Sequence, residues 1–283
     1  MAARAPRPHP LHEPSETELR LMVQQELEAI LPWSARLREA IVALGGMVVM
    51  FARAVTRAFS RPSSLGATAW QVEALGVRSL SIATLTALFA GLVLSLQFAF
   101  FMARFGVQHT VGKVVVLTLF RELGPVLTAL TVGARIGSGI TAELGSMQVT
   151  EQIDAIRALG ADPVKKLVTP RLLACMVVMP ALTALADVFG LSAGSVVVYT
   201  QYEIPFEQYF RSAIETATLM DFGSGIAKSV VFGGIIAVVG CYKGFNVSGG
   251  TEGVGRGTTE TVAITSVAVC LSDFLLTKLF LAL

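Results

Sequence analysis

Residues 79–103, SLSIATLTALFAGLVLSLQFAFFMA, form an uncharged run of 25 residues that decides the fold class. An α-helix rises about 1.5 Å per residue, so this run exceeds the roughly 30 Å hydrocarbon core of a bilayer. Gln97 is its one strongly polar side chain. A helix satisfies its own backbone hydrogen bonds, as a segment within lipid must. The run therefore predicts a membrane-spanning helix.

Four further apolar stretches follow, at residues 114–147, 172–199, 222–242 and 261–283. Gly124 and Pro125 lie inside the first of these and predict a kink or break there. Ionisable groups are costly at membrane depth, so they have to pair or line a polar path. Six ionisable residues in these stretches have to meet this requirement: Arg121, Glu122, Arg135, Glu143, Asp187 and Asp273. We therefore expect an all-α integral membrane protein with about five transmembrane helices.

The composition of the chain agrees with this class. Of its 283 residues, 53% are hydrophobic and 15% charged, and the mean hydropathy is +0.67; a soluble domain has about 25% charged residues. No basic stripe interleaved with aromatic residues is present, which argues against a nucleic-acid partner. The histidines lie apart and the three cysteines sit in apolar stretches without a second ligand, so we predict no metal site and no cofactor.

The first 78 residues differ from the rest of the chain. Residues 1–15 are rich in proline and predict a disordered tail. Residues 16–78 predict amphipathic helices that lie in the membrane interface and precede the five-span domain of residues 79–283. The segment from Trp33 to Phe59 has apolar residues on one face and arginines near its ends. An alternative is that its uncharged part, Ala40 to Ala52, is a sixth span, although 13 residues are fewer than the roughly 20 required.

Lysine and arginine residues favour a cytoplasmic N-terminus, with the segment between the second and third spans on the same side. Within that segment, residues 149–160, VTEQIDAIRALG, predict a short helix capped by Thr150 and ended by Gly160. Ile153, Ile156 and Leu159 give it an apolar edge. It suits contact with a soluble partner, although an ordinary connector between spans is the alternative.

No motif for chemistry is found. The string GVQHTVGKV at residues 106–114 lacks the spacing and the Ser or Thr of a phosphate-binding loop. The glycine-rich run at residues 249–257 has no strand before it, and we expect a flexible loop there. Clustered catalytic side chains are also absent from the sequence, so we expect no enzymatic activity.

Long ordered motifs do resemble a known family. Residues 120–174, FRELGPVLTALTVGARIGSGITAELGSMQVTEQIDAIRALGADPVKKLVTPRLLA, are similar to those of MlaE (YrbE) permeases of bacterial lipid ABC transporters. KSVVFGGIIAVVGCYKG (228–244), EGVGRGTTETVAITSVAV (252–269) and DFLLTKL (273–279) match the same family in the same order. The resemblance runs from about Gly76 to the C-terminus.

This resemblance implies a homodimeric permease in the bacterial inner membrane that moves phospholipid between the inner and outer membranes and maintains outer-membrane lipid asymmetry. It implies three kinds of protein partner: a cytoplasmic ATP-binding-cassette ATPase that hydrolyses the ATP, a STAS-domain protein and a periplasmic MCE-domain hexamer. It also implies that the short cytoplasmic helix couples the permease to the ATPase, through Glu151, Gln152, Ile153, Asp154, Ile156 and Arg157.

A lipid permease needs an apolar cavity with a few polar groups for the head group. We expect seven residues of the first two spans to contribute: Leu94, Gln97, Phe98, Phe101, Met102, Arg121 and Glu122. Arg121 suits a phosphate and Glu122 an amine, although the two side chains could simply neutralise each other.

Two other function classes are open at this point. A secondary transporter of lipids, sterols or small molecules would use ions bound at Asp187, Asp273 or the Arg121–Glu122 pair. Internal repeats would favour it, and the two halves of the sequence show none. A lipid-modifying membrane enzyme would need clustered catalytic groups, which are not found.

Overall fold

The structure is a computed structural model that describes residues 32–59 and 65–282. The predicted tail at residues 1–15 and the first predicted amphipathic helix, from Ser15 to Ile30, lie outside the described residues. Every regular element in the described ranges is helical. This confirms the all-α prediction.

The chain divides into two compact units, one ending at Val48 and one beginning at Val49. The helix α2 (Pro32–Phe59) runs through the boundary between them. Within α2, residues Leu37–Ala58 are long and apolar enough to cross a membrane. The described residues thus contain six such helices, one more than the five expected. This sixth helix corresponds to the alternative span considered above, whose uncharged run is only 13 residues long, whereas a span tolerates a few arginines near its ends.

The remaining long helices lie in the second unit. The predicted first span corresponds to α4 (Leu80–Ala103). Before it, α3 (Leu65–Gly76) continues through a 3-10 turn (Val77–Ser79) into α4. The helix α3 therefore extends the first predicted span and is not a separate short helix. The other long helices are α6 (Gly124–Val149), α8 (Thr169–Tyr202), α10 (Leu219–Phe245) and α11 (Gly250–Ala282).

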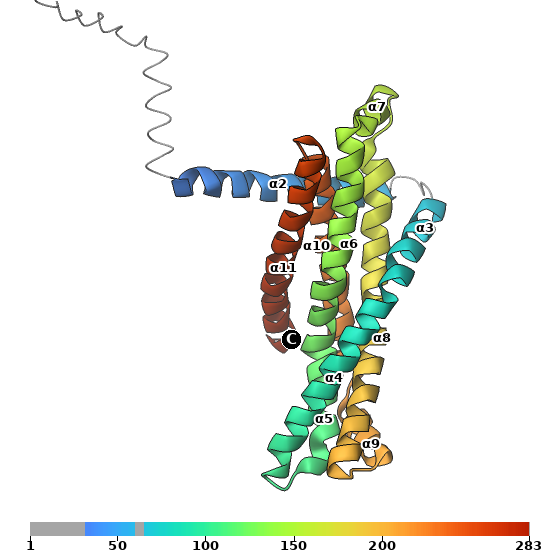
Figure 1. The fold of residues 1–283 in the computed structure, drawn as a ribbon, viewed down its shortest axis with the longest axis vertical. Helices are drawn as coiled ribbons and strands as arrows, with labels where there is room; N and C mark the ends of the chain where they lie inside the picture. The colour runs from blue at the N-terminus through green and yellow to red at the C-terminus, as the bar shows by residue number, and fades with distance from the viewer. Residues whose placement is uncertain (1–31, 60–64, 283) are drawn as a thin grey trace, which may run out of the picture. The chain divides into compact units, whose positions relative to one another are not determined.

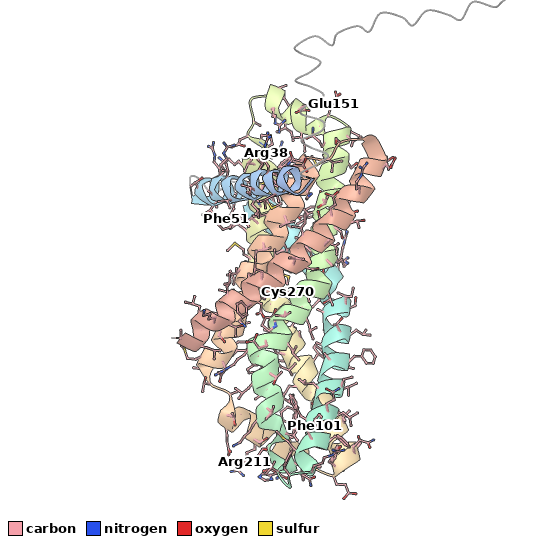
Figure 2. All side chains as sticks on the ribbon, turned by 90° about the vertical axis from the view of Figure 1, so that its left-hand side faces the viewer. Arg38, Phe51, Phe101, Glu151, Arg211 and Cys270 are labelled. Carbon is pink, nitrogen blue, oxygen red and sulfur yellow. The ribbon has the colours of Figure 1, made fainter. Side chains whose placement is uncertain are left out.

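Within this unit, α8 packs along α4 and α10, and α6 packs along α10 and α11. Two short helices, α5 (Val111–Thr118) and α9 (Phe206–Thr216), lie against each other at one end of the bundle, and α7 (Gln152–Ala158) lies at the opposite end (Figure 1). Figure 2 shows the same separation in side chains, with Glu151 near one end and Phe101 and Arg211 near the other. Large apolar side chains such as Phe89 on α4 and Phe274 on α11 are exposed, as lipid-facing helices require.

The prediction of a kink or break at Gly124 and Pro125 is met in part, because the helical stretch is continuous but a π-helical turn breaks its α-helical hydrogen-bond pattern just before Gly124. Between α5 and α6 the chain makes a π-helical turn (Leu119–Leu123), and Pro125 stands in the first turn of α6. Proline has no N–H to donate, so the first turn of a helix, where that N–H would have no partner within the helix, accommodates it best. This break carries Arg121 and Glu122.

The glycine-rich run at residues 249–257 was expected to be a flexible loop, and this is wrong. The helix α11 begins at Gly250 and continues through the run. Gly253 lies so close to the backbone of Ser248 that any side chain there would overlap it. The glycines therefore permit a close approach at a helix start.

Small residues line the contact between α4 and α8. The buried face of α4 repeats every four residues as Ala83, Ala87, Gly91, Ser95 and Ala99. A Cβ atom on Gly91 would overlap the backbone oxygen of Gly190 on α8. Small residues at this spacing let two helix backbones approach closely within lipid, where van der Waals packing drives association.

Candidate functional site

Lys228 of α10 is the centre of a polar cluster at membrane depth. Its side chain is 2% exposed. The ammonium donates to the backbone oxygen of Arg121 (2.8 Å), Glu122 Oε2 (2.9 Å) and Thr277 Oγ1 (2.7 Å), which uses all three of its hydrogens. Asp273 Oδ1 lies 3.0 Å from the same nitrogen but accepts no hydrogen bond from a described residue. It is held by charge, so one lysine serves two carboxylates.

Arg121 forms an ion pair with Asp221 at the start of α10, and its Nε donates to Asp221 Oδ1 over 2.6 Å. Asp221 also accepts from the backbone N–H of Thr218 (2.8 Å), while Thr218 Oγ1 accepts from the N–H of Asp221 (3.2 Å). This reciprocal capping box fixes the carboxylate. The Arg121 side chain is 47% exposed, so the guanidinium is held and still accessible to a ligand.

A pocket of about 480 Å³ opens beside these groups. Arg121, Glu122, Asp221 and Lys228 line its polar side, and its apolar side includes Met220, Phe280 and Leu281. With Asp273, the cluster holds two cationic and three acidic side chains, a formal sum of −1 when all are ionised. The pocket can thus offer a cation to a phosphate, carboxylates to an amine, and an apolar surface to a hydrocarbon chain.

The seven residues predicted to bind lipid fall in three places. Arg121 and Glu122 line the pocket. Leu94, Phe98 and Met102 recur every four residues and pack, partly buried, against an internal cluster that contains Tyr209. Gln97 and Phe101 are exposed on the outer face of α4. Within one chain, only the two residues at the helix break therefore share the pocket, because helical periodicity turns the α4 residues to different sides.

Tyr209 fixes the end of the bundle opposite α7. Its ring is buried among α4, α5 and α8, and its hydroxyl lies 3.3 Å from Ser95 Oγ. Burial raises the pKa of Tyr209 from its ordinary value of 10 to about 12. The phenol is therefore neutral at physiological pH.

The expected coupling segment forms α7, although its cap differs from the prediction. Thr150 ends α6, and its hydroxyl donates to the Ser146 oxygen at 2.8 Å. Glu151 precedes α7 in a left-handed conformation, with φ 59°. The left-handed backbone at Glu151 turns the chain sharply between α6 and α7. Glu151, and not Thr150, therefore occupies the position before the first residue of α7.

Side chains of α7 divide between the bundle and the surface. Ile153 is fully buried, so it does not belong to the apolar edge that was expected to contact a soluble partner. Ile156 is half-buried and Leu159 is 85% exposed. The remaining proposed coupling residues, Glu151, Gln152, Asp154 and Arg157, are exposed, and Asp154 accepts from Arg157 over 2.7 Å. The outer surface of this segment thus combines charged side chains with exposed alanines and the apolar side chain of Leu159.

Sequence reasoning missed the second half of the site. Sequence reasoning did not identify the polar residues Thr218, Asp221 and Thr277. It also did not identify the apolar wall formed by Met220 and Phe280. Thr218 and Asp221 have the spacing of a capping pair, a signal that was available.

The chain matches a family model described as Permease MlaE over residues 68–279. A probable ABC transporter permease of Rickettsia typhi is 38% identical over 226 residues, which cover 80% of this chain and 87% of that protein. One of Synechocystis is 40% identical, over 74% of this chain and 80% of that protein. The chloroplastic protein TRIGALACTOSYLDIACYLGLYCEROL 1 of Arabidopsis thaliana is 38% identical, over 75% of this chain and 61% of that protein.

Proposed function

Because the chain belongs to the MlaE permease family, we propose that it is the membrane-spanning subunit of an ATP-driven lipid transporter. Its substrate is a phospholipid moved between the inner and outer membranes of a bacterial envelope. The name of the Arabidopsis relative contains that of a glycolipid, which supports a lipid substrate class.

The observation that carries this proposal is the pocket at the helix break. Its accessible guanidinium at Arg121 suits a phosphate, and the partly exposed carboxylate of Glu122 suits an amine, while Met220 and Phe280 provide an apolar wall. A zwitterionic phospholipid presents this combination of groups. The formal charge of −1 in the cluster favours a head group with a positive end over a purely anionic one.

The energy for transport comes from a separate ATPase in this proposal. The charged surface of α7, with Glu151, Asp154 and Arg157 exposed, is where a cytoplasmic ATPase docks. The permease acts as a homodimer in the inner membrane. Although α2 is long enough to cross a membrane, it lies along the interface in this proposal, so the N-terminus and α7 are both on the cytoplasmic side. A STAS-domain protein on the cytoplasmic side and an MCE-domain hexamer on the periplasmic side complete the assembly.

The test is transport of a labelled phospholipid by the reconstituted permease with its ATPase. Arg121→Ala should reduce transport strongly, because it removes the accessible guanidinium that would bind the lipid phosphate. Arg211→Ala is the matched control, since Arg211 is exposed on α9, pairs with Glu215 one turn away and lies outside the pocket. A photocrosslinker at Phe280 should also capture lipid. Full transport by Arg121→Ala, with no lipid captured at Phe280, would place the substrate elsewhere.

The same assay separates the alternative function. A secondary transporter would move lipid without ATP when a proton or sodium gradient is applied. The ATP-driven permease should transport with ATP alone after all ion gradients are collapsed.

A further inference from the structure

Asp187 lies in the middle of α8 and faces the break between α5 and α6. It is 1% exposed. Its carboxylate touches Gly124 so closely that a Cβ atom there would overlap Oδ1. Asp187 Oδ1 has no hydrogen-bond partner in the part of the chain that the structure describes, and neither has the buried hydroxyl of Thr183, one turn earlier on α8. Two unpartnered polar groups therefore lie on one face of α8.

A small cavity adjoins the break at the same place. Its volume is about 10 Å³, and alanines, leucines and Gly124 make up most of its lining, beside three threonines, Thr86, Thr128 and Thr131. A cavity of roughly this size holds a water molecule only when polar groups surround it. The lining of this cavity is mostly apolar and does not include Asp187, so the cavity offers the carboxyl no polar partner.

No cation compensates the Asp187 carboxyl among the described residues. On the π-helical turn, Arg121 pairs with Asp221, and Glu122 pairs with Lys228 of α10. On α4, the residues that line the cavity are Ala83, Thr86, Ala87 and Ala90, none of which is charged. At the start of α8, Arg171 pairs with Glu143 of α6. An ionised carboxylate left unpaired at this depth is strongly disfavoured.

We propose that Asp187 is an internal proton-binding site: the carboxyl carries a proton and, through its close contact at Gly124, holds the α5–α6 break in position. The protonated group is neutral, so it needs no cation at this depth, and it can donate as well as accept a hydrogen bond. Asp187 is then a positioning residue. It fixes the turn that places Arg121 and Glu122 at the pocket. The effect of this positioning on lipid transport rests on the proposed function.

Infrared spectroscopy tests the proton directly and needs no transport. In an ester-free detergent, the purified protein should show the carbonyl stretch of a protonated carboxyl, which shifts in D₂O. Asp187→Asn should remove this band. Asp162→Asn should keep it, because Asp162 is partly exposed and pairs with Arg57. Absence of the band from the wild-type protein, or its persistence in Asp187→Asn, would overturn the proposal.

Transport variants then test the positioning role. Asp187→Asn stays neutral and can still hydrogen-bond, so transport should stay close to that of the wild type. Asp187→Val removes the hydrogen-bonding groups and should lower transport about tenfold, which corresponds to about 1.4 kcal/mol. Replacing sodium by a large organic cation should change nothing. An inactive but folded Asp187→Asn, or a requirement for sodium, would show that an ionised carboxylate or a bound metal cation is needed instead. If the lipid proposal itself fails, the infrared result still stands on its own.

Discussion

Replacing Lys228 by methionine tests the charge balance of the polar cluster. Methionine has a similar length and is apolar, so the change removes the ammonium with little change in volume. It leaves Glu122 and Asp273 facing each other without the cation that lies 2.9 Å and 3.0 Å from them. It also leaves the hydroxyl of Thr277 and the backbone oxygen of Arg121 without their donor.

The size of the effect follows from the burial of the three partners. Removing one member of a fully buried ion pair costs about 3–5 kcal/mol. The side chains of Glu122 and Asp273 are 39% and 19% exposed, so water relieves part of this cost. We expect a loss of about 2–3 kcal/mol of stability, or a fall of about 5–10 °C in the unfolding temperature of a chain of this size.

The measurement is thermal unfolding of the purified protein in nanodiscs. Lys278→Met is the matched control, because it removes a lysine from an exposed position on α11. Neutralising the carboxylates as well, in Lys228→Met/Glu122→Gln/Asp273→Asn, should recover most of the stability while transport stays low. If Lys228→Met lowers the unfolding temperature no more than Lys278→Met, or if the triple variant recovers nothing, the charge-balance account is wrong.

Three further predictions concern other parts of the bundle. Glu151→Lys/Asp154→Lys should release or uncouple the ATPase while the permease stays in the membrane; normal co-purification and transport would contradict this. Gly91→Ala places a Cβ atom against the backbone of Gly190 and should lower the unfolding temperature, whereas Gly139→Ala, whose Cβ would meet no atom within 4 Å, should not; equal losses would contradict the close backbone approach. The free energy of unfolding should fall as pH rises from about 10 to about 12. Over this range Tyr209 ionises in the unfolded chain, whereas burial keeps its phenol protonated in the folded protein. Tyr209→Phe should abolish this pH dependence.

The long helices could be predicted because lipid imposes a simple rule on sequence. An uncharged run such as residues 79–103 has one compatible structure, and the helix break at Pro125 follows from the missing N–H. The helix α2 shows where that rule weakens. Its arginines shorten the uncharged run to 13 residues, although the helix itself runs from Pro32 to Phe59.

The site could be predicted only in part, because its partners come from distant segments. Arg121 and Glu122 stood out as charges beside a helix break, and Asp273 as a charge that needed a partner. Nothing in the sequence indicated that Lys228 would pair with both acids, since this depends on how α10 and α11 pack around the break. The α4 residues illustrate the reverse error. Gln97 and Phe98 are neighbours in sequence, but one is exposed and the other packs inward.

The row of small residues on α4 has a mechanical consequence. With backbone against backbone at Gly91 and Gly190, no side chains lie between the two helices at this point that could change rotamer and let one slide past the other. The two helices are therefore suited to move as one rigid lever. Any motion that carries cargo through the bundle would then occur at contacts made by longer, adaptable side chains, such as those of Lys228 and its partners.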